Sequence, residues 1–243
     1  MQRFFVDKEA YDGSTVTVVG ADAYHISRSL RMKSGEKITA CLPDGTALLC
    51  ELATFSDEKV VATVLSSSPL TSEPPCRIHI YQALPKGDKL ETVVQKSVEC
   101  GAYSITPFVS ERCIAKVNDN FNKKLERLNR ISYEAAKQCG RNIIPEVCPP
   151  LTYKQMLGRA AGCDLPLFCY EAEGAFPLGN LLKKDVRDIS VIIGSEGGFS
   201  PDEAALARES GMLLTGLGPR ILRCETASTF VLSALSLYFE LGI

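Results

Sequence analysis

The stretch that decides the fold runs from residue 189 to residue 203 and reads ISVIIGSEGGFSPDE. Its first five residues are apolar apart from Ser190, as expected of a strand buried on both faces of a parallel sheet. Ser200 can cap a helix, Pro201 suits the first helical position, and Glu203 completes a capping box. The sequence therefore predicts a buried strand, a glycine loop and a helix, in this order.

The loop inside this stretch combines three glycines with one acidic residue. Gly194, Gly197 and Gly198 have no Cβ, so the backbone can take positive φ and lie close against a flat ligand. Glu196 stands where a GxGxxG motif needs glycine, and the loop lacks the Gly-Lys-Ser/Thr of a phosphate-binding loop. A carboxylate here favours a cationic or hydroxyl-bearing ligand over phosphate. On the residues alone, a purely structural turn is the alternative.

A second motif has the same organisation. It reads LGPRILRCETA at residues 217–227 and follows a short apolar strand that ends at Leu217. Gly218 and the proline after it force a turn. Arg223 and Glu225 flank the start of the next helix and can both point toward a ligand at the strand ends. A structural salt bridge between them is the alternative.

Strand and helix patterns alternate around both motifs, from residue 77 to the end of the chain. The expected strands are 77–84, 104–109, 165–170, 189–193 and 213–217, and the expected helices are 88–100, 120–139, 201–210 and 227–241. This alternation predicts an α/β domain with a mostly parallel sheet covered by helices. Ligands bind at the carboxyl ends of strands in such sheets, which makes the loops after residues 170, 193 and 217 the candidates.

The first 72 residues show a different pattern. Short alternating runs broken by Asp-Gly pairs predict β-hairpins, and together they predict a small β-barrel with a helical insertion at 23–32. The runs lie at 15–19, 36–42, 47–54 and 59–65. The stretch SSSPLTSEPP at 66–75 is typical of a linker, because serines and prolines crowd it. The chain is therefore divided into domains 1–72 and 73–243.

The composition is that of a soluble globular protein. The 243 residues are 45% hydrophobic and 23% charged, and no signal peptide or apolar run of roughly 18 residues is present, so we expect a cytosolic protein. The ten cysteines include no pair separated by two to four residues, which excludes a zinc signature and favours small core residues in a reducing compartment. With only two histidines, we expect no metal site.

The charge balance argues against a protein that holds nucleic acid by bulk charge. Lys and Arg total 27 against 29 for Asp and Glu, a net charge of −2. Only the middle of the chain is basic, with 12 basic and 7 acidic side chains at 77–141. An anionic partner could lie there, although a solvated helix face explains the same residues.

The two motifs in this order resemble the paired signature of the small-subunit ribosomal RNA uridine-N3 methyltransferases, the RsmE family of the SPOUT superfamily. Further matching blocks cover nearly all of the chain: MQRFF at 1–5, His25 with Leu30 and Arg31, QALPKG at 82–87, Lys96 with Glu99, PF at 107–108 with ER at 111–112, and EAA at 134–136 with Gln138 and Arg141. The chain departs from the family pattern at four positions. Ser195 stands where the family usually has Pro, Cys224 where it has Thr, Cys139 where it has Ser, and Leu128 where Trp is common. None of these changes removes a charged candidate.

The resemblance implies a PUA-like RNA-binding barrel followed by a SPOUT α/β domain whose carboxyl-terminal segment forms a trefoil knot. It implies that S-adenosylmethionine lies bent in this knot, held mainly by backbone groups, and that two chains form a homodimer. The cofactor residues carried over are Gly194, Glu196, Gly197, Leu217, Gly218 and Leu222. The RNA-binding residues carried over are Arg3, Arg28, Arg31 and Arg112. The implied partner is small-subunit ribosomal RNA within a ribosomal particle.

The implied reaction assigns roles to two residues. Methylation of uracil N3 requires its hydrogen to leave while negative charge spreads onto the neighbouring carbonyl oxygens, and Arg223 could stabilise that charge. Glu225 could orient Arg223 or accept the proton, although a carboxylate beside arginine is a weak base. N3 lies on the pairing edge, so the uridine must be unpaired or flipped out. The rival hypotheses are a non-catalytic RNA-binding assembly factor and an enzyme that binds a nucleotide or sugar phosphate.

Overall fold

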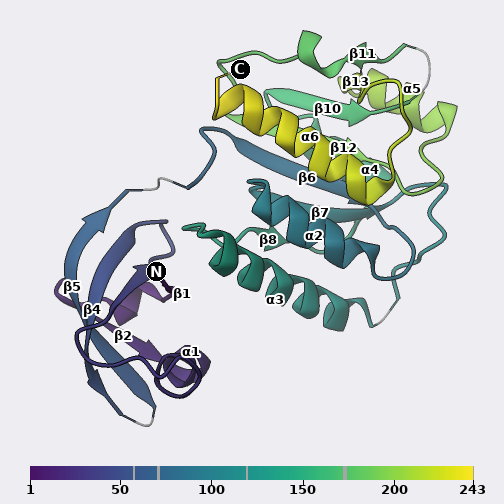
Figure 1. Ribbon diagram of the computed structural model, residues 1–243. Helices are drawn as coiled ribbons and strands as arrows, with labels where there is room; N and C mark the ends of the chain where they lie inside the picture. The colour runs from purple at the N-terminus through teal and green to yellow at the C-terminus, as the bar shows by residue number, and fades with distance from the viewer. Residues whose placement is uncertain (57, 70–71, 119, 172–173, 243) are drawn as a thin grey trace. The chain divides into compact units, whose positions relative to one another are not determined.

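The computed structural model describes residues 1–56, 58–69, 72–118, 120–171 and 174–242, which form a mixed α/β fold (Figure 1). The chain divides into two compact units. The first comprises Met1–Glu73 together with Ala136–Ile144, and the second comprises Pro74–Ala135 together with Pro145–Ile243. The segment 136–144 therefore belongs with the amino-terminal unit, although it lies far along the chain.

The first unit contains a curled five-stranded sheet with the order β1-β3-β4-β5-β2 (Figure 1). Its strands are β1 (Arg3–Phe5), β2 (Thr15–Val19), β3 (Lys37–Cys41), β4 (Ala47–Phe55) and β5 (Lys59–Ser68). Neighbouring strands are antiparallel except for the pair β1 and β3. Strands β3, β4 and β5 pair antiparallel in succession, as the expected hairpins do, with Asp44-Gly45 at the first turn and alternate residues buried in one core. Asp12-Gly13 makes a turn just before β2, which pairs with β5.

Two details of this unit differ from the sequence-based expectation. The linker expected at 66–75 begins later, because Ser66, Ser67 and Ser68 pair with β4 and extend β5. The helical insertion begins earlier than residue 23, as α1 (Gly20–Tyr24), and continues as a π-helix, η2 (His25–Ser29).

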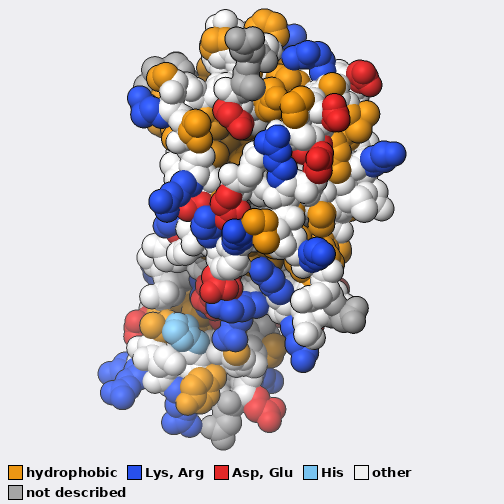
Figure 2. Space-filling view, turned by 90° about the vertical axis from the view of Figure 1, so that its right-hand side faces the viewer, with side chains coloured by type: hydrophobic (Ala, Val, Ile, Leu, Met, Phe, Trp, Pro, Cys, Tyr) orange, Lys and Arg blue, Asp and Glu red, His pale blue; other side chains and the backbone are white. Residues whose placement is uncertain are grey.

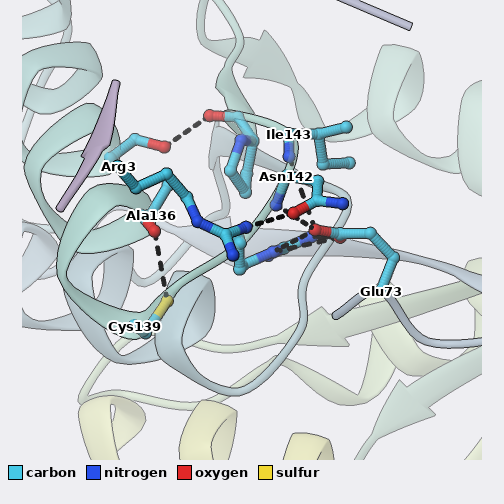
Figure 3. Close-up of polar contacts among 9 residues, drawn as sticks. Arg3, Glu73, Ala136, Cys139, Asn142 and Ile143 are labelled. Atoms are coloured by element: carbon cyan, nitrogen blue, oxygen red, sulfur yellow. Dashed lines mark hydrogen bonds and ion pairs between the residues drawn. The ribbon is translucent and has the colours of Figure 1, made fainter. Parts of the chain in front are cut away.

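A buried polar cluster holds the segment 136–144 in the first unit (Figure 3). The guanidinium of Arg141 donates to Glu73, and both side chains are buried, with exposed fractions of 4% and 11%. The backbone N–H groups of Asn142 and Ile143 also donate to the Glu73 carboxylate, at 3.1 and 3.4 Å. Arg3 donates to the Asn142 side chain. Arg3, predicted to bind RNA, therefore lies in a structural cluster.

The second unit contains a parallel sheet with the order β11-β13-β10-β12-β6-β7-β8, and β9 pairs with β7 (Figure 1). The strands are β6 (Arg77–Ala83), β7 (Ser104–Val109), β8 (Glu146–Val147), β9 (Leu151–Thr152), β10 (Leu165–Cys169), β11 (Phe176–Pro177), β12 (Asp188–Ile193) and β13 (Leu213–Gly216). This arrangement confirms the predicted α/β class with a parallel sheet. Strand β12 lies in the interior of the sheet, and its last five residues are buried.

Helices cover this sheet on both faces. They are α2 (Lys89–Glu99), α3 (Phe121–Cys139), α4 (Tyr153–Ala160), α5 (Pro201–Glu209) and α6 (Cys224–Phe239). Short 3-10 turns are η1 (Lys8–Ala10) in the first unit and η3 (Leu178–Asn180) in the second. Helices α2, α3 and α6 lie side by side in Figure 1, with Arg127 of α3 paired to Glu91 of α2. Of the described helices, none has both the length and the apolar character that crossing a membrane requires.

Candidate functional site

A cavity opens where β10, β12 and β13 end at the carboxyl edge of the parallel sheet. Three loops that follow these strands line it, as the topology of parallel sheets predicts. The lining residues are Cys169, Tyr170, Glu171, Ile193, Gly194, Ser195, Glu196, Gly198, Phe199, Leu217, Gly218, Arg220, Ile221, Leu222, Cys224 and Ala227. The two motifs that the sequence singled out thus meet in one place. We call residues 194–200 the glycine loop and residues 217–223 the second loop.

The glycine loop is folded back on itself. The Gly198 N–H donates to the Ser195 carbonyl at 3.0 Å, and Gly198 has φ +62°, a conformation that favours glycine. A Cβ added at Gly194 would lie 3.2 Å from the Gly198 Cα and from the Phe199 ring. Close packing against the rest of the loop therefore favours glycine at residue 194, and the positive φ favours it at residue 198.

The end of the glycine loop is fixed by aromatic packing. The Phe199 ring is buried with its centroid 4.3 Å from that of Phe168 and stacks parallel to Phe108. The predicted capping box is present immediately after it: the Glu203 N–H donates to Ser200 Oγ, and the Ser200 N–H donates to Glu203 Oε2 at 3.0 Å. The loop therefore enters α5 in one defined direction.

Arg112 supports the middle of the glycine loop from outside. Its Nη1 donates to the Gly197 carbonyl at 3.0 Å, and a Cβ on Gly197 would lie 3.0 Å from the Arg112 Cβ. Gly197 itself does not line the cavity, unlike the other five cofactor candidates. Arg112, predicted to bind RNA, thus also contacts the backbone of the glycine loop.

The Glu196 carboxylate is held by two groups from the chain segment that follows β6. Lys89 Nζ donates to its Oε1 at 2.7 Å, and the Lys86 N–H donates to the same oxygen at 3.2 Å. Partial burial raises the pKa of Glu196, but the bond from Lys89 and the backbone N–H donors outweigh it, so the pKa lies below its usual value. Glu196 therefore lines the cavity as an ionised carboxylate that is already hydrogen-bonded within the protein.

The second loop is open by contrast. Gly218 has φ +101°, and nothing lies within 4 Å of the position its Cβ would take. Ile221 lines the cavity yet is 88% exposed. Leu217 and Leu222 present apolar surface to the same cavity.

The two catalytic candidates lie at the start of α6, beside the cavity lining. Arg223 is exposed and occupies the N-cap position of α6, with extended backbone at φ −67° and ψ 152°. No salt bridge joins Arg223 to Glu225 in the described part of the chain. The alternative of a structural ion pair between them is therefore not observed. Neither residue is among the cavity-lining set.

Cys224 separates these two residues and is buried. Its thiol donates to Glu225 Oε2 at 3.2 Å. Burial, together with the nearby Glu225 carboxylate, raises the pKa of Cys224 to about 12, so the thiol is neutral. Partial burial raises the pKa of Glu225, but backbone N–H donation, the thiol hydrogen bond and the charges of Lys89 and Arg223 together hold it below its usual value.

The lining of the cavity combines apolar, polar and charged groups. The glycine backbone and the apolar side chains Phe199, Leu217 and Leu222 provide contact surfaces, while Glu196 and Glu171 add negative charge and Arg220 adds positive charge. Ser195 Oγ is buried without a hydrogen-bond partner in the described structure. Over the described ranges, no group of three or more His, Cys, Asp or Glu side chains could hold a metal ion.

The remaining RNA-binding candidates, Arg28 and Arg31, are exposed in the first unit. Residues 23–35 contain three cations and no acidic side chain. Arg31 has φ +52°, which is uncommon for a side chain of its size. Tyr24, which sequence reasoning missed, is 62% exposed in the same segment. Figure 2 shows cationic and hydrophobic side chains close to a histidine on the face that it displays.

Several residues around the cavity were not predicted. Gln82 and Lys89 contact the glycine loop, and Tyr170 and Glu171 line the cavity. Gln82 falls in the QALPKG block, which was noted for its resemblance without a role being assigned. The only signal for Tyr170 and Glu171 was their place after a predicted strand.

The family match of the unit that holds the parallel sheet and the cavity gives the class of protein. Residues 72–236 match the family described as RNA methyltransferase domain. The match includes both loops and every element of the parallel sheet.

Full-length relatives give the particular family. The chain is 34% identical to the ribosomal RNA small subunit methyltransferase E of Bacillus subtilis, over 99% of this chain and 98% of that protein. It is 32% identical to the protein of the same name from Synechocystis, over 98% of this chain and 78% of that protein. The crystal structure of a ribosomal RNA small subunit methyltransferase E from Neisseria gonorrhoeae bound to S-adenosyl methionine has a TM-score of 0.85 and 30% identity, covering 98% of both chains. The chain belongs to the ribosomal RNA small subunit methyltransferase E family, which confirms the resemblance.

Proposed function

We propose that this protein transfers the methyl group of S-adenosylmethionine to N3 of one uridine in small-subunit ribosomal RNA. The observation that carries the proposal is that the two glycine-containing loops meet in one cavity, with the exposed Arg223 beside its lining. The family membership supports the cofactor and the RNA substrate. The N3 position rests on the resemblance and on the chemistry of the residues at the start of α6.

The cofactor supplies an electrophilic methyl group on a positively charged sulfur. Gly194 and Gly198 let the glycine loop fold tightly beside it, Gly218 leaves open space at the second loop, and Phe199 and Leu222 offer apolar surface. The lining carries Glu196 and Glu171 as acidic residues and Arg220 as a basic one, and Lys89 pairs with Glu196. Gly197 acts indirectly, through its contact with Arg112.

Arg223 stabilises the charge that develops on the uracil oxygens as N3 loses its proton and gains the methyl group. The lowered pKa of Glu225 makes its carboxylate a poor proton acceptor, so its role is electrostatic, orienting Arg223 and the substrate. Cys224 takes no part in bond making, because its thiol is neutral and buried. Proton release from N3 then goes to solvent.

RNA is held by the first unit, through the basic segment that contains Arg28 and Arg31, with Arg3 and Arg112 as further contacts. The exposed Tyr24 ring supports this assignment, because unpaired RNA bases stack on aromatic side chains. Changing Arg31 to Glu should weaken RNA binding and lower the salt slope by about one unit per lost phosphate contact. Tyr24→Ala should weaken binding and leave the slope unchanged.

The finer architecture is proposed from the family resemblance. We assign the curled sheet to a PUA-like barrel and the segment from β12 to α6 to a trefoil knot. A homodimer is supported by Phe230 and Leu237 of α6, each 43% exposed, whereas Val231 and Leu235 of the same helix are core residues. Light scattering in solution should then give about twice the 26.4 kDa chain mass.

One experiment tests the reaction. Small ribosomal particles from a strain that lacks this protein are incubated with the protein and labelled S-adenosylmethionine, and the product nucleoside is mapped by mass spectrometry. We expect one N3-methylated uridine. Methylation on carbon or ribose would overturn the chemistry, and cofactor binding without any methylation would favour the non-catalytic assembly factor.

A further inference from the structure

Gln82 is a fully buried polar residue at the end of β6, directly opposite Ile193 in the ladder between β6 and β12. Its Nε2 donates to the carbonyl of Ala83 and to the carbonyl of Gly194, both at 3.0 Å. Gly194 is the first residue after β12, where the regular ladder with β6 has ended. The Gln82 amide thus continues the ladder by one carbonyl and reaches the first residue of the glycine loop.

The orientation of this amide is dictated by its partners. Both partners are carbonyl oxygens, which only accept hydrogen bonds, so the NH₂ group must face them. The Gln82 Oε1 is left buried without a partner among the described residues. A buried oxygen without a partner is unfavourable and adds no hydrogen bond that could hold the side chain. The two bonds of the nitrogen therefore determine the position of the side chain.

A shift of Gly194 cannot stay local. Gly194 lies against Gly198, since even the position of a Cβ at Gly194 is 3.2 Å from the Gly198 Cα, so a displaced Gly194 would press on Gly198. Both line the cavity. The chain segment that begins at Gln82 also holds the loop at a second point, through the Lys86 N–H and the Glu196 carboxylate.

We propose that Gln82 is a positioning residue that sets the glycine loop in its ligand-binding form before the ligand arrives. It does not line the cavity, so it acts through the Gly194 carbonyl and touches neither cofactor nor RNA. The inference rests on the proposed function for the identity of the ligand, and on the geometry alone for the order of the loop.

The test compares two variants with a matched control. Gln82→Met removes the donor without adding charge, and Gln82→Glu keeps the shape but places a carboxylate against two carbonyl oxygens. Ser190→Ala is the control. Ser190 lies on β12, is fully buried like Gln82, and donates one hydrogen bond to a carbonyl, that of Ala160, outside the glycine loop. All three changes should lower the unfolding free energy.

Only the Gln82 variants should change the loop. In calorimetry with S-adenosylmethionine, we expect Gln82→Met to raise the Kd roughly five- to tenfold at every pH, the size expected for losing the one hydrogen bond that reaches the loop, at Gly194. Gln82→Glu should raise it more at pH 8 and less as the pH falls, because burial raises the pKa of such a carboxyl and its protonated form donates again to Gly194. In steady-state kinetics, KM for the cofactor should rise while kcat changes little.

A cofactor-independent measurement separates this inference from the proposed function. Hydrogen exchange of the Gly198 amide, which donates to the Ser195 carbonyl, should accelerate in both Gln82 variants of the free protein and stay unchanged in Ser190→Ala. Unchanged exchange together with unchanged affinity would overturn the positioning role, as would an equal loss of affinity in the control. If the wild-type protein failed to bind S-adenosylmethionine, the proposed function would fail while the exchange result still decided the role of Gln82.

Discussion

The two loops that line the cavity are held in opposite ways. Side chains or N–H groups from outside reach the glycine loop at Gly194, Glu196 and Gly197, and Phe199 anchors its end in the core. Within the described structure, no hydrogen bond or ion pair involves residues 217–222 of the second loop. A preorganised loop lowers the ordering cost of binding, whereas an unanchored one can adapt to its ligands. We therefore expect the first loop to determine cofactor affinity and the second to adjust when cofactor and RNA bind.

The largest effect is expected at the end of the second loop, at Arg223. If this residue acts only in the transition state, Arg223→Ala should lower kcat roughly a hundredfold or more and leave the Kd for S-adenosylmethionine nearly unchanged. Single-turnover methylation and calorimetry measure the two quantities. Cys224→Ser is the matched control and should keep its activity, because the buried thiol is neutral. Full activity of Arg223→Ala, or an inactive Cys224→Ser, would contradict the mechanism.

The next largest effect tests the anchored loop. A valine at Gly197 would press against the Arg112 side chain, since even a Cβ lies 3.0 Å from that residue's Cβ. Overpacking of this kind costs about 1–3 kcal/mol, so cofactor affinity should fall roughly ten- to a hundredfold. Calorimetry gives the affinity, and circular dichroism checks that the fold is intact. Unchanged affinity in a folded Gly197→Val protein would show that the anchoring does not matter.

The difference between the loops also marks what the sequence could predict. Local patterns were sufficient for β12, for the capping box at Ser200 and for the turn at Gly218, because each depends on neighbours along the chain. Helix α4 was missed although Thr152 and Gln155 form a capping box, because its eight residues make little more than two turns and give a short pattern. The parallel direction of the strands followed from the alternation of strand and helix patterns. The edge of the sheet at which the cavity lies followed from that direction.

Contacts between distant residues could not be predicted in this way. Gln82 reaches Gly194 only because β6 pairs with β12 in one register, which no periodicity reports. Lys89 meets Glu196 for the same reason. The place of residues 136–144 in the first unit depends on Glu73, which is more than sixty residues away along the chain and was assigned to a linker.

A smaller effect is expected from the ion pair that anchors Glu196. In Lys89→Met the pKa of Glu196 should rise, because partial burial is no longer opposed by the lysine. A carboxyl whose pKa is lowered on folding stabilises the protein above its unfolded pKa, and this contribution disappears as the pH falls through the folded value. Wild type should therefore exceed the variant in unfolding free energy by at most about 1 kcal/mol at pH 7, since the pair is about one third exposed. Urea unfolding should show the difference vanishing at acidic pH, and a difference that persisted there would exclude the ion pair as its source.

The smallest effect is expected in the second loop, from Gly218→Ala. The added methyl group has open space, so only the backbone conformation at φ +101° opposes it. Such strain costs about 1–3 kcal/mol where surrounding contacts fix the conformation, but an unanchored loop can relieve it by rotating to a negative φ. Cofactor affinity should change by no more than a few-fold.

The matched change is Gly198→Ala, where φ is +62° and the new Cβ would meet the Glu171 carboxylate at 2.7 Å, within a loop that is held at several points. Calorimetry on both variants should show the larger loss for Gly198→Ala, because that loop cannot rotate away from the strain. Equal losses would mean that the second loop is as rigid as the first, and the contrast between them would not hold.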